Sequence, residues 1–269
     1  MAEALEAPFD RPDAGFNHLP GWTWVGTYGG HYLQADRLAA FEHGFFTRQW
    51  QGRGPAELAG YLSAGISVHR PQQIHSAVVL EASQAVGEPW PEADGLVSDG
   101  GGQSLWVCGA DCTPVLIADP RSGRVAAAHA GWRGVAGRIL PAAIARLTAA
   151  GSNPHDLLVA LGPSVSGANY QVERPVSLEV AAALRSDGAQ NAEALQELIV
   201  CGALLADPDP GKDRLDLRSV IVRQLEHEGI PAMSIAVCPL CTVAEPALFH
   251  SWRRDQVKAV QWSGIVSQG

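Results

Sequence analysis

Short apolar runs, rich in β-branched residues and bounded by Gly, Pro or Asp, recur along the whole chain. Runs of this length and composition predict β-strands. The predicted strands span residues 22–28, 44–49, 68–73, 77–80, 104–107, 115–118, 125–128, 157–161, 232–237, 248–252 and 257–266.

Other segments carry apolar residues at helical spacing. They predict helices at residues 54–64, 135–149, 175–184, 192–198 and 217–228. In the second of these, Ile139, Ile144 and Leu147 are among the apolar positions, and Gly151 lies just beyond as a stop signal. Pro141 falls inside this segment, so that it either kinks the helix or places the helix start nearer Ile139.

The order of these elements bears on the fold class. Strands grouped early with few helices, followed by mixed elements, favour an α/β (mixed α+β) fold, with mixed β-sheets flanked by helices, over a doubly wound sheet. No internal repeat or low-complexity linker divides the chain. We therefore expect a single layered catalytic domain over residues 21–269, preceded by a loose leader at residues 1–20.

Composition narrows the class of protein. Of the 269 residues, 46% are hydrophobic, which is enough for a sizeable core. The net charge is −9 and no Lys/Arg run occurs, so we expect no nucleic-acid partner. No apolar stretch approaches the roughly 18–20 residues that a bilayer requires, and the N-terminus lacks a signal pattern. These features predict a soluble cytoplasmic protein without a membrane partner; they leave the oligomeric state open.

Cysteine usage points the same way. Five cysteines at irregular spacing, without a signal peptide, argue against a disulfide framework. Cys238 and Cys241 form a CxxC pair, but no second pair accompanies it and a poor helix start follows. A redox or structural zinc site there is therefore disfavoured, and packing beside the C-terminal strands is the simpler interpretation.

The candidate chemistry lies in two histidines and one cysteine, each beside an apolar run. Cys112 follows His75 by 37 residues, and His129 follows Cys112 by 17. Two imidazoles and one thiolate form a three-ligand set, which on Zn²⁺ leaves the fourth tetrahedral position open for water or substrate. Taken singly, His75 is more often a packed histidine and Cys112 a small core hydrophobe, so the interpretation depends on the combination.

Two neighbours of these residues are further candidates. Asp111 precedes Cys112 inside very apolar sequence, where a carboxylate needs a partner. It is an acceptor behind a metal ligand, a general acid or base, or a turn former. Arg133 offers bidentate geometry for phosphate, and a helix that opens soon after Gly134 would add backbone N–H groups for an anion. The alternative for Arg133 is a surface ion pair.

Polar residues near the C-terminal half extend the candidate site. Ser164 and Asn169 lie in a small-residue loop after an apolar run, which would line a nucleoside or phosphate site unless it is a plain turn. Arg253 and Arg254 are adjacent, and on a strand they would face opposite ways, one into a pocket and one into solvent. Two solvated arginines are the alternative. Dinucleotide, P-loop and serine-hydrolase motifs are absent from the sequence.

Several of these motifs, in this order, resemble the laccase-domain family. The resemblance covers roughly residues 45–255. Members of that family are known variously as polyphenol oxidase, multifunctional purine nucleoside phosphorylase and peptidoglycan editing factor. The motifs are Gln73-Ile-His75-Ser, Asp94-Gly-Leu-Val-Ser-Asp, Ala110-Asp-Cys112-Thr-Pro114, His129-Ala-Gly-Trp-Arg-Gly134, Leu161-Gly-Pro and Phe249-His-Ser-Trp-Arg-Arg-Asp255.

The resemblance implies a single α/β domain with zinc, or in older attributions copper, bound by His75, Cys112 and His129. It implies phosphorolysis of adenosine, inosine, guanosine and methylthioadenosine, with adenosine deamination and phenol oxidation as further activities. The chain departs from the family pattern after Asp255, where Gln-Val-Lys-Ala-Val replaces a Thr-Gly-Arg turn, and at Gln171, where members tend to have Glu.

Three enzyme hypotheses follow. A zinc-dependent purine nucleoside phosphorylase would bind phosphate through Arg133 and Arg253 or Arg254, and deamination would use Asp111 to move the proton. A copper-dependent polyphenol oxidase fits less well, because nine histidines without H-x-H pairs are few for a multinuclear copper cluster. A cysteine hydrolase of peptidoglycan precursors, with Cys112 as nucleophile and His129 as base, leaves His75 without a role. A purely binding or structural role would leave the clustered His, Cys and Arg unexplained.

Overall fold

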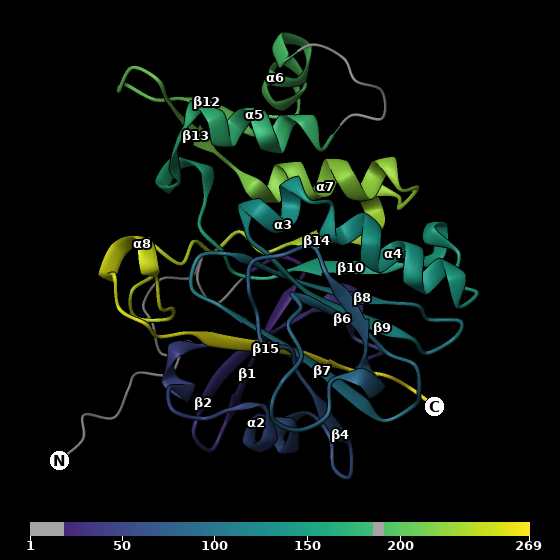
Figure 1. Cartoon of the computed structure of the whole chain (residues 1–269). Helices are drawn as coiled ribbons and strands as arrows, with labels where there is room; N and C mark the ends of the chain where they lie inside the picture. Colours follow the sequence, from purple (N-terminus) through teal and green to yellow (C-terminus); the bar gives the residue numbers. More distant parts are fainter. Residues whose placement is uncertain (1–18, 185–190) are drawn as a thin grey trace, which may run out of the picture.

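Two six-stranded mixed sheets pack face to face at the centre of the protein (Figure 1). The computed structural model describes residues 19–184 and 191–269. In sheet order, the first sheet contains β1 (Trp22–Thr27), β2 (Gly30–Ala35), β3 (His43–Phe46), β15 (Gln261–Val266), β7 (Gln103–Gly109) and β4 (Ser67–His69). The second contains β14 (Ile235–Val237), β10 (Leu158–Leu161), β8 (Thr113–Ala118), β9 (Val125–Ala130), β6 (Gly95–Val97) and β5 (Val79–Glu81).

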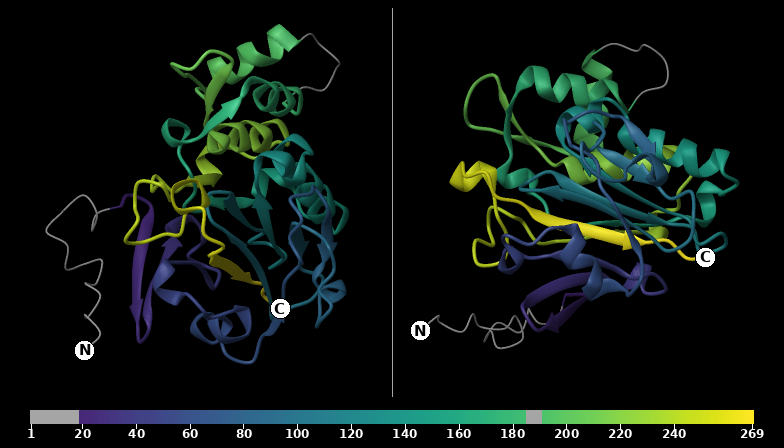
Figure 2. Two further views of the ribbon diagram at one scale, coloured as in Figure 1. Left: turned by 60° about the vertical axis from the view of Figure 1, so that its left-hand side comes forward. Right: turned by 60° about the horizontal axis from the view of Figure 1, so that its bottom comes forward.

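A smaller sheet and the helices surround this centre. The third sheet consists of β11 (Gln171–Glu173), β13 (Lys212–Leu215) and β12 (Leu204–Ala206). The described helices are α2 (Pro55–Leu62), α3 (Trp132–Ala136), α4 (Ile139–Ala149), α5 (Arg174–Ala182), α6 (Asn191–Val200), α7 (Leu217–His227) and α8 (Trp252–Asp255). Figures 1 and 2 show α3, α4 and α7 over one face of the second sheet. Helix α2 packs against the outer face of the first sheet.

Strand β9 explains how the layers fit together. All six of its residues are buried, because one face meets the first sheet and the other meets the helices. Val125 and Ala127 belong to the core between the sheets, whereas Ala126, Ala128 and Ala130 belong to the core beneath the helices. By the alternation of a strand, His129 falls on the side between the sheets. The second sheet thus presents a histidine at the margin of an apolar core.

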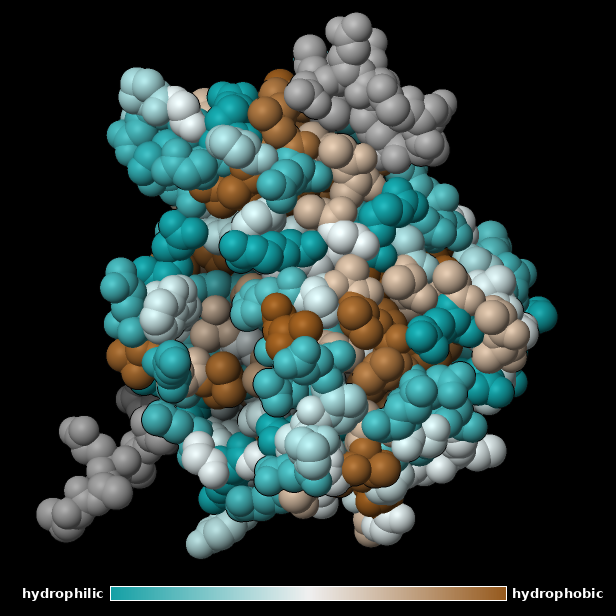
Figure 3. All heavy atoms as spheres, viewed as in Figure 1, coloured by the Kyte–Doolittle hydropathy of each residue, from teal (hydrophilic) through white to brown (hydrophobic). Residues whose placement is uncertain are grey.

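The predicted fold class is confirmed: mixed sheets are flanked by helices in an α/β arrangement. The predicted boundary between a leader and a domain at residue 20 stays a prediction, and residues 1–18 lie outside the described residues. Within the described part of the chain, no helix is both long and apolar enough to cross a bilayer. The face seen in Figure 3 mixes hydrophilic and hydrophobic side chains.

Most predicted elements are present with shifted ends, but two predictions need correction. The predicted strand at residues 248–252 is wrong: the segment ends in helix α8, and the Ser251 hydroxyl caps that helix by accepting the Arg254 N–H at 3.1 Å. The predicted helix at 135–149 is instead the two helices α3 and α4, because Arg138 adopts a left-handed conformation with φ 63°. Helix α4 begins at Ile139, the start that Pro141 favoured.

Several short strands escaped sequence analysis. Strands β2, β6, β11, β12 and β13 were not predicted. Strand β13 consists of only four residues, Lys-Asp-Arg-Leu. In so short a strand, the alternation of half-buried and buried positions cannot be told from a polar loop in the sequence. Strands β11 and β12 acquire their pairing only by lying on either side of β13.

Candidate metal centre

The structure brings His75, Cys112 and His129 together. Their ligand atoms all lie within 4.8 Å of one another, and the two imidazole rings meet edge to face with centroids 4.8 Å apart. His75 lies in the loop after β4, Cys112 in the turn between β7 and β8, and His129 near the end of β9. His129 is buried, Cys112 is half-buried and His75 is exposed, so the cluster has one open side. That arrangement suits a three-ligand metal site with a position for water or substrate.

The backbone beside the cluster is shaped for close approach. A Cβ atom added at Gly131 would lie 2.9 Å from the Cys112 sulfur and 3.4 Å from Cδ2 of His75. A side chain at this position would therefore displace the thiolate. The donor set and this clearance both fit a bound zinc or copper ion.

Asp94, immediately before β6, organises two of the three ligands. Its buried carboxylate accepts a hydrogen bond from Nδ1 of His129 at 2.9 Å. With Nδ1 protonated in this way, Nε2 of His129 keeps its lone pair for a metal. The same carboxylate accepts the backbone N–H groups of Ile74 (3.2 Å), His75 (3.0 Å) and Ser76 (2.6 Å), and the Ser76 hydroxyl (2.8 Å).

These contacts fix the loop that carries His75, whose backbone has φ 60°. Burial alone would raise the pKa of Asp94, but hydrogen bonds from His129 and Ser76 lower it to about 2. Sequence analysis quoted Asp94 only as part of a motif and missed this role. The available signal was a carboxylate inside the apolar run Ala93-Asp94-Gly95-Leu96-Val97, where a buried charge needs several partners.

The cysteine and the histidines also set each other's charge. Burial would raise the pKa of the Cys112 thiol, but hydrogen bonds from His129 and His75 lower it to about 6. Burial would lower the pKa of His129, but its bonds to Asp94 and Cys112 raise it to about 9. Without a metal the pair is therefore a thiolate beside an imidazolium at neutral pH. A thiolate is the form of cysteine that binds metals and attacks electrophiles.

Asp111 lies in the β7–β8 turn next to Cys112, with φ 96°. Its carboxylate accepts the Thr242 hydroxyl and the backbone N–H of Arg253, both at 2.6 Å. Its backbone carbonyl accepts the N–H of Val165 at 3.0 Å. Asp111 therefore ties the metal-ligand turn to α8. These contacts show Asp111 as an acceptor for Thr242 and Arg253, and its role in catalysis stays a prediction.

The two adjacent arginines differ sharply. The guanidinium of Arg254 is bonded to other groups of the protein. It donates to the carbonyl of Thr242 at 2.6 Å and to that of Phe249 at 2.9 Å. It also donates to the Asp255 carboxylate. Arg253 is exposed, and its guanidinium lies over the ring of Tyr170 at 5.0 Å. The two arginines lie on a helical turn, so the predicted alternation on a strand is wrong, and which of them faces a substrate stays a prediction.

Tyr170 lies near several predicted site residues, a placement that sequence analysis missed. Burial, and next the charge of Cys112, raise the pKa of its phenol to about 12. Arg253, Asp111 and Arg133 also act on this phenol through their charges, so Tyr170 lies among the predicted site residues. The neighbourhood could not be read from the sequence, because these residues come from four separate segments.

Arg133 lies on α3, which begins at Trp132. The predicted anion-binding helix start after Gly134 is therefore wrong, and α3 is too short to provide such a site. Arg133 is exposed and stacks on Trp132 with its guanidinium 4.3 Å from the ring. An open groove of about 650 Å³ adjoins it and is also lined by Glu179.

The loop after β10 contains the other two predicted residues. Ser164 is fully buried, and its hydroxyl has no hydrogen-bond partner in the described part of the chain. Asn169 is exposed, and its amide donates to Ser166 at 3.1 Å and to the Cys241 sulfur at 3.5 Å. Cys241 is a buried free thiol, as is Cys238. Asn169 is thus the more accessible of the two predicted residues.

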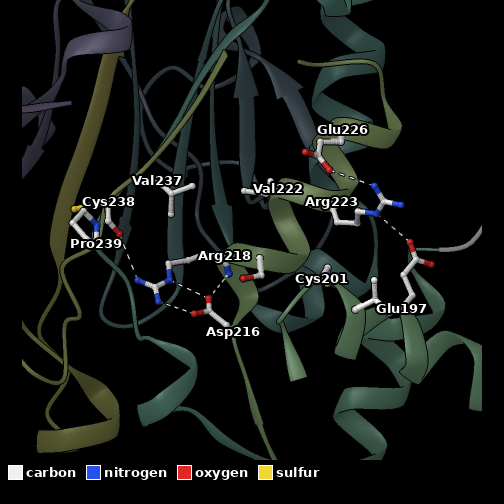
Figure 4. A pocket seen from close by; sticks show the side chains of 12 residues that line it. Glu197, Cys201, Asp216, Arg218, Val222, Arg223, Glu226, Val237, Cys238 and Pro239 are labelled. Carbon is white, nitrogen blue, oxygen red and sulfur yellow. Dashed lines mark hydrogen bonds and ion pairs between the residues drawn. The ribbon is translucent and has the colours of Figure 1, made fainter. Parts of the chain in front are cut away.

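A wide groove elsewhere on the molecule does not include the cluster (Figure 4). It has a volume of about 760 Å³ and is bordered by α6, α7 and the segment after β14. Its charged side chains pair with one another, as Arg218 does with Asp216 at 2.6 Å and Arg223 with Glu197 at 3.3 Å. Among the described residues, the group that could hold a metal lies at His75, Cys112 and His129 and not in this groove.

Comparison with known proteins identifies the family. A purine nucleoside phosphorylase from Synechocystis, slr1573, is 42% identical over 264 residues, which are 91% of this chain and 97% of that protein. The crystal structure of YlmD from Geobacillus stearothermophilus has a TM-score of 0.76 at 25% identity, over 91% of this chain and 99% of that one. Bacillus licheniformis YfiH has a TM-score of 0.73 at 27% identity, over 88% and 96%. Residues 56–267 match the multi-copper polyphenol oxidoreductase laccase family, and the chain belongs to that family.

Proposed function

We propose that this protein is a zinc-dependent purine nucleoside phosphorylase. It acts on adenosine, inosine, guanosine and methylthioadenosine, and also deaminates adenosine. The observation that carries the proposal is the His75–Cys112–His129 cluster. The exposed cation Arg253 is linked to it through Asp111, the chain neighbour of Cys112, whose carboxylate accepts the Arg253 backbone N–H. The relative from Synechocystis, named a purine nucleoside phosphorylase, supports the reaction class. Nucleoside and orthophosphate are then the partners of the site.

Phosphorolysis needs a bound phosphate and stabilisation of a sugar that becomes oxocarbenium-like. In our proposal Arg253 and Arg133 supply positive charge for the phosphate, and Asn169 contributes an amide to the nucleoside. Both arginines are exposed, and both act electrostatically on Tyr170. Ser164 would contact substrate only after its loop moves, since its side chain is fully buried. Arg254 supports this site indirectly by tying α8 to the loop after Cys241.

His75, Cys112 and His129 would hold the zinc, which supplies Lewis acidity and an activated water for deamination. Asp94 keeps His129 in the tautomer that a ligand needs. Asp111 was our sequence-based choice for the proton in deamination. Each of its carboxylate oxygens accepts one hydrogen bond and keeps a second lone pair, through which it would take the proton.

Product analysis with purified protein and adenosine, with and without phosphate, tests the proposal. Adenine and ribose 1-phosphate that form only with phosphate are the expected products, and inosine reports deamination. Cys112→Ala is the negative control, because it removes the thiolate from the cluster. No turnover of any of the four nucleosides by the zinc-loaded enzyme would refute the proposal.

The thiolate–imidazolium pair of Cys112 and His129 favours one alternative, a cysteine hydrolase that edits peptidoglycan precursors. Thiol alkylation separates the two mechanisms. If Cys112 is a zinc ligand, zinc protects it from iodoacetamide and a chelator removes the protection. A hydrolase nucleophile would instead react equally in both conditions. The family name also favours polyphenol oxidation with copper, which phenol turnover by copper-loaded protein would reveal.

A further inference from the structure

Tyr170 forms a fixed aromatic platform beneath Arg253. Its backbone N–H donates to the carbonyl of Gly167 at 3.2 Å, and its own carbonyl accepts the N–H of Leu215 at 3.0 Å. The half-buried ring packs against the apolar core that lies under α3 and α4. Because both its backbone and its ring are anchored, the ring has little freedom to follow a mobile partner. The guanidinium of Arg253 lies 5.0 Å above it.

Arg253 is held on three sides although its side chain is exposed. The first contact is the backbone N–H, which Asp111 accepts at 2.6 Å. The second is Nη1, which donates to the carbonyl of Gln171 at 2.9 Å. The third is the ring of Tyr170. An exposed arginine usually moves among many rotamers, and ordering one costs side-chain entropy. Here that ordering has already taken place.

In the described part of the chain, Nε and Nη2 of Arg253 have no protein acceptor. Within residues 19–184 and 191–269, its Nε and Nη2 atoms make no hydrogen bond, whereas the equivalent atoms of Arg254 both donate to Asp255. Nε–H and Nη2–H form one edge of the guanidinium, and this edge matches two oxygens of a phosphate or carboxylate. Two neighbouring arginines thus have opposite roles: one is saturated by the protein, and one is ordered with a free edge.

We propose that Tyr170 is a positioning residue that holds the Arg253 guanidinium ready for a phosphate oxyanion. The inference rests on the proposed phosphorolysis and assigns its phosphate subsite. The ring carries this role. The phenol also stays uncharged at working pH, because burial and the charge of Cys112 raise its pKa. A neutral ring does not form an ion pair with the guanidinium, so that the positive charge remains available to the anion. Asp111 supports the same arrangement from the backbone side.

The test measures the dissociation constant for orthophosphate by calorimetry, together with KM for phosphate and for adenosine. Tyr170→Leu removes the ring, and we expect orthophosphate binding to weaken by about two- to fivefold, the equivalent of one exposed cation–π contact. Tyr170→Phe keeps the ring and should weaken binding less than Tyr170→Leu does. Arg253→Ala should weaken it by about tenfold or more, because charge-assisted bonds are lost. KM for phosphate should rise in each variant, with KM for adenosine little changed.

Arg53→Ala is the matched control. Arg53 lies over Trp50 at 5.1 Å, a cation–π contact of nearly the same geometry on the other side of the first sheet. Its removal should leave orthophosphate binding unchanged. Tyr170→Met, which keeps an apolar side chain without a ring, replaces Tyr170→Leu if the latter fails to fold. Zinc affinity should be the same in every variant, which would separate positioning of Arg253 from damage to the metal centre.

The outcomes separate the inference from the proposed function. Phosphate binding that depends on Tyr170 and Arg253, without nucleoside turnover, would support the inference and refute the phosphorylase. Turnover with unchanged phosphate binding in Tyr170→Leu and Tyr170→Met would support the phosphorylase and overturn the inference. A loss in Tyr170→Phe as large as in Tyr170→Leu would show that the hydroxyl, not the ring, carries the effect, and would also overturn it. Absence of orthophosphate binding by the wild type would likewise overturn the inference.

Discussion

Replacing Asp94 with asparagine should damage the metal centre without touching a metal ligand. The asparagine side chain would keep one acceptor oxygen but turn an NH₂ group toward N–H donors, whichever way the amide is oriented. Those donors are His75 and His129 on one side and Ile74 and Ser76 on the other. Since the carboxylate is fully buried, water cannot replace the lost bonds. Removing one partner of a buried charged pair costs about 3–5 kcal/mol of stability.

The same change should lower zinc affinity by about tenfold to a hundredfold, the usual effect of removing a carboxylate behind a histidine ligand. Competition with a chromophoric chelator measures this affinity, and denaturant unfolding of the metal-free protein measures stability. Asp99→Asn is the control: Asp99 accepts Ser83 N–H at 3.2 Å and the Gln103 amide at 2.8 Å, but it is exposed. If Asp94→Asn bound zinc and unfolded like Asp99→Asn, the reasoning on Asp94 would be refuted.

The protonation of Asp94 adds a pH signature. Its pKa in the folded protein, about 2, is below the ordinary value of 3.8. For a lowered carboxyl pKa, the stabilisation is complete above the unfolded-state value and is lost as the pH falls through the folded-state value. The stability difference between wild type and Asp94→Asn should therefore be constant between about pH 4 and pH 6.5 and shrink toward pH 2. It should also shrink as the pH rises toward 9, because the raised pKa of His129 depends on Asp94 and the stabilisation it gives is lost when His129 deprotonates.

Three further predictions concern the cluster. Cys112→Ala and His129→Ala should each lose both zinc and nucleoside turnover, measured by metal analysis and chromatography; activity in a metal-free variant would contradict the zinc role. In metal-free protein, alkylation of Cys112 should reach half its maximal rate near pH 6, where its thiol ionises, and His129→Ala should move this midpoint upward. Gly131→Ala should weaken zinc binding at least tenfold while the protein stays folded, because the new Cβ would lie 2.9 Å from the Cys112 sulfur; wild-type zinc affinity in this variant would show that the backbone yields.

The fold was predictable where one local pattern decides the structure. The apolar runs of β8 and β9 stand out because both faces of these strands are buried, and each strand lies within two residues of its predicted end. The segment 248–252 misled the analysis because Leu248 and Phe249 are buried without being in a strand. Their burial comes from packing in the core between the sheets, which no local pattern reveals.

The residues of the candidate site also fall into those that a local motif predicts and those whose role depends on distant partners. The three predicted ligands are residue types with specific chemistry at motif positions, and the structure brings their atoms together. The roles of Asp94 and Tyr170 depend on partners far away in the chain, such as the pairing of Asp94 with His129 over 35 positions. The difference between Arg253 and Arg254 depends on which carbonyls lie nearby. Such assignments require three-dimensional neighbours and could not be made from the sequence.

The small side chains of β9 have a consequence for the site. Ala127 faces the first sheet and helps to set the distance between the two sheets. His129 belongs to the second sheet, whereas His75 follows a strand of the first. A bound ion would therefore link the two sheets. The distance between the sheets would in turn affect the distances from the ion to its ligands. Enlarging Ala127, which is not a ligand, would then change metal affinity by changing the distance between the two sheets.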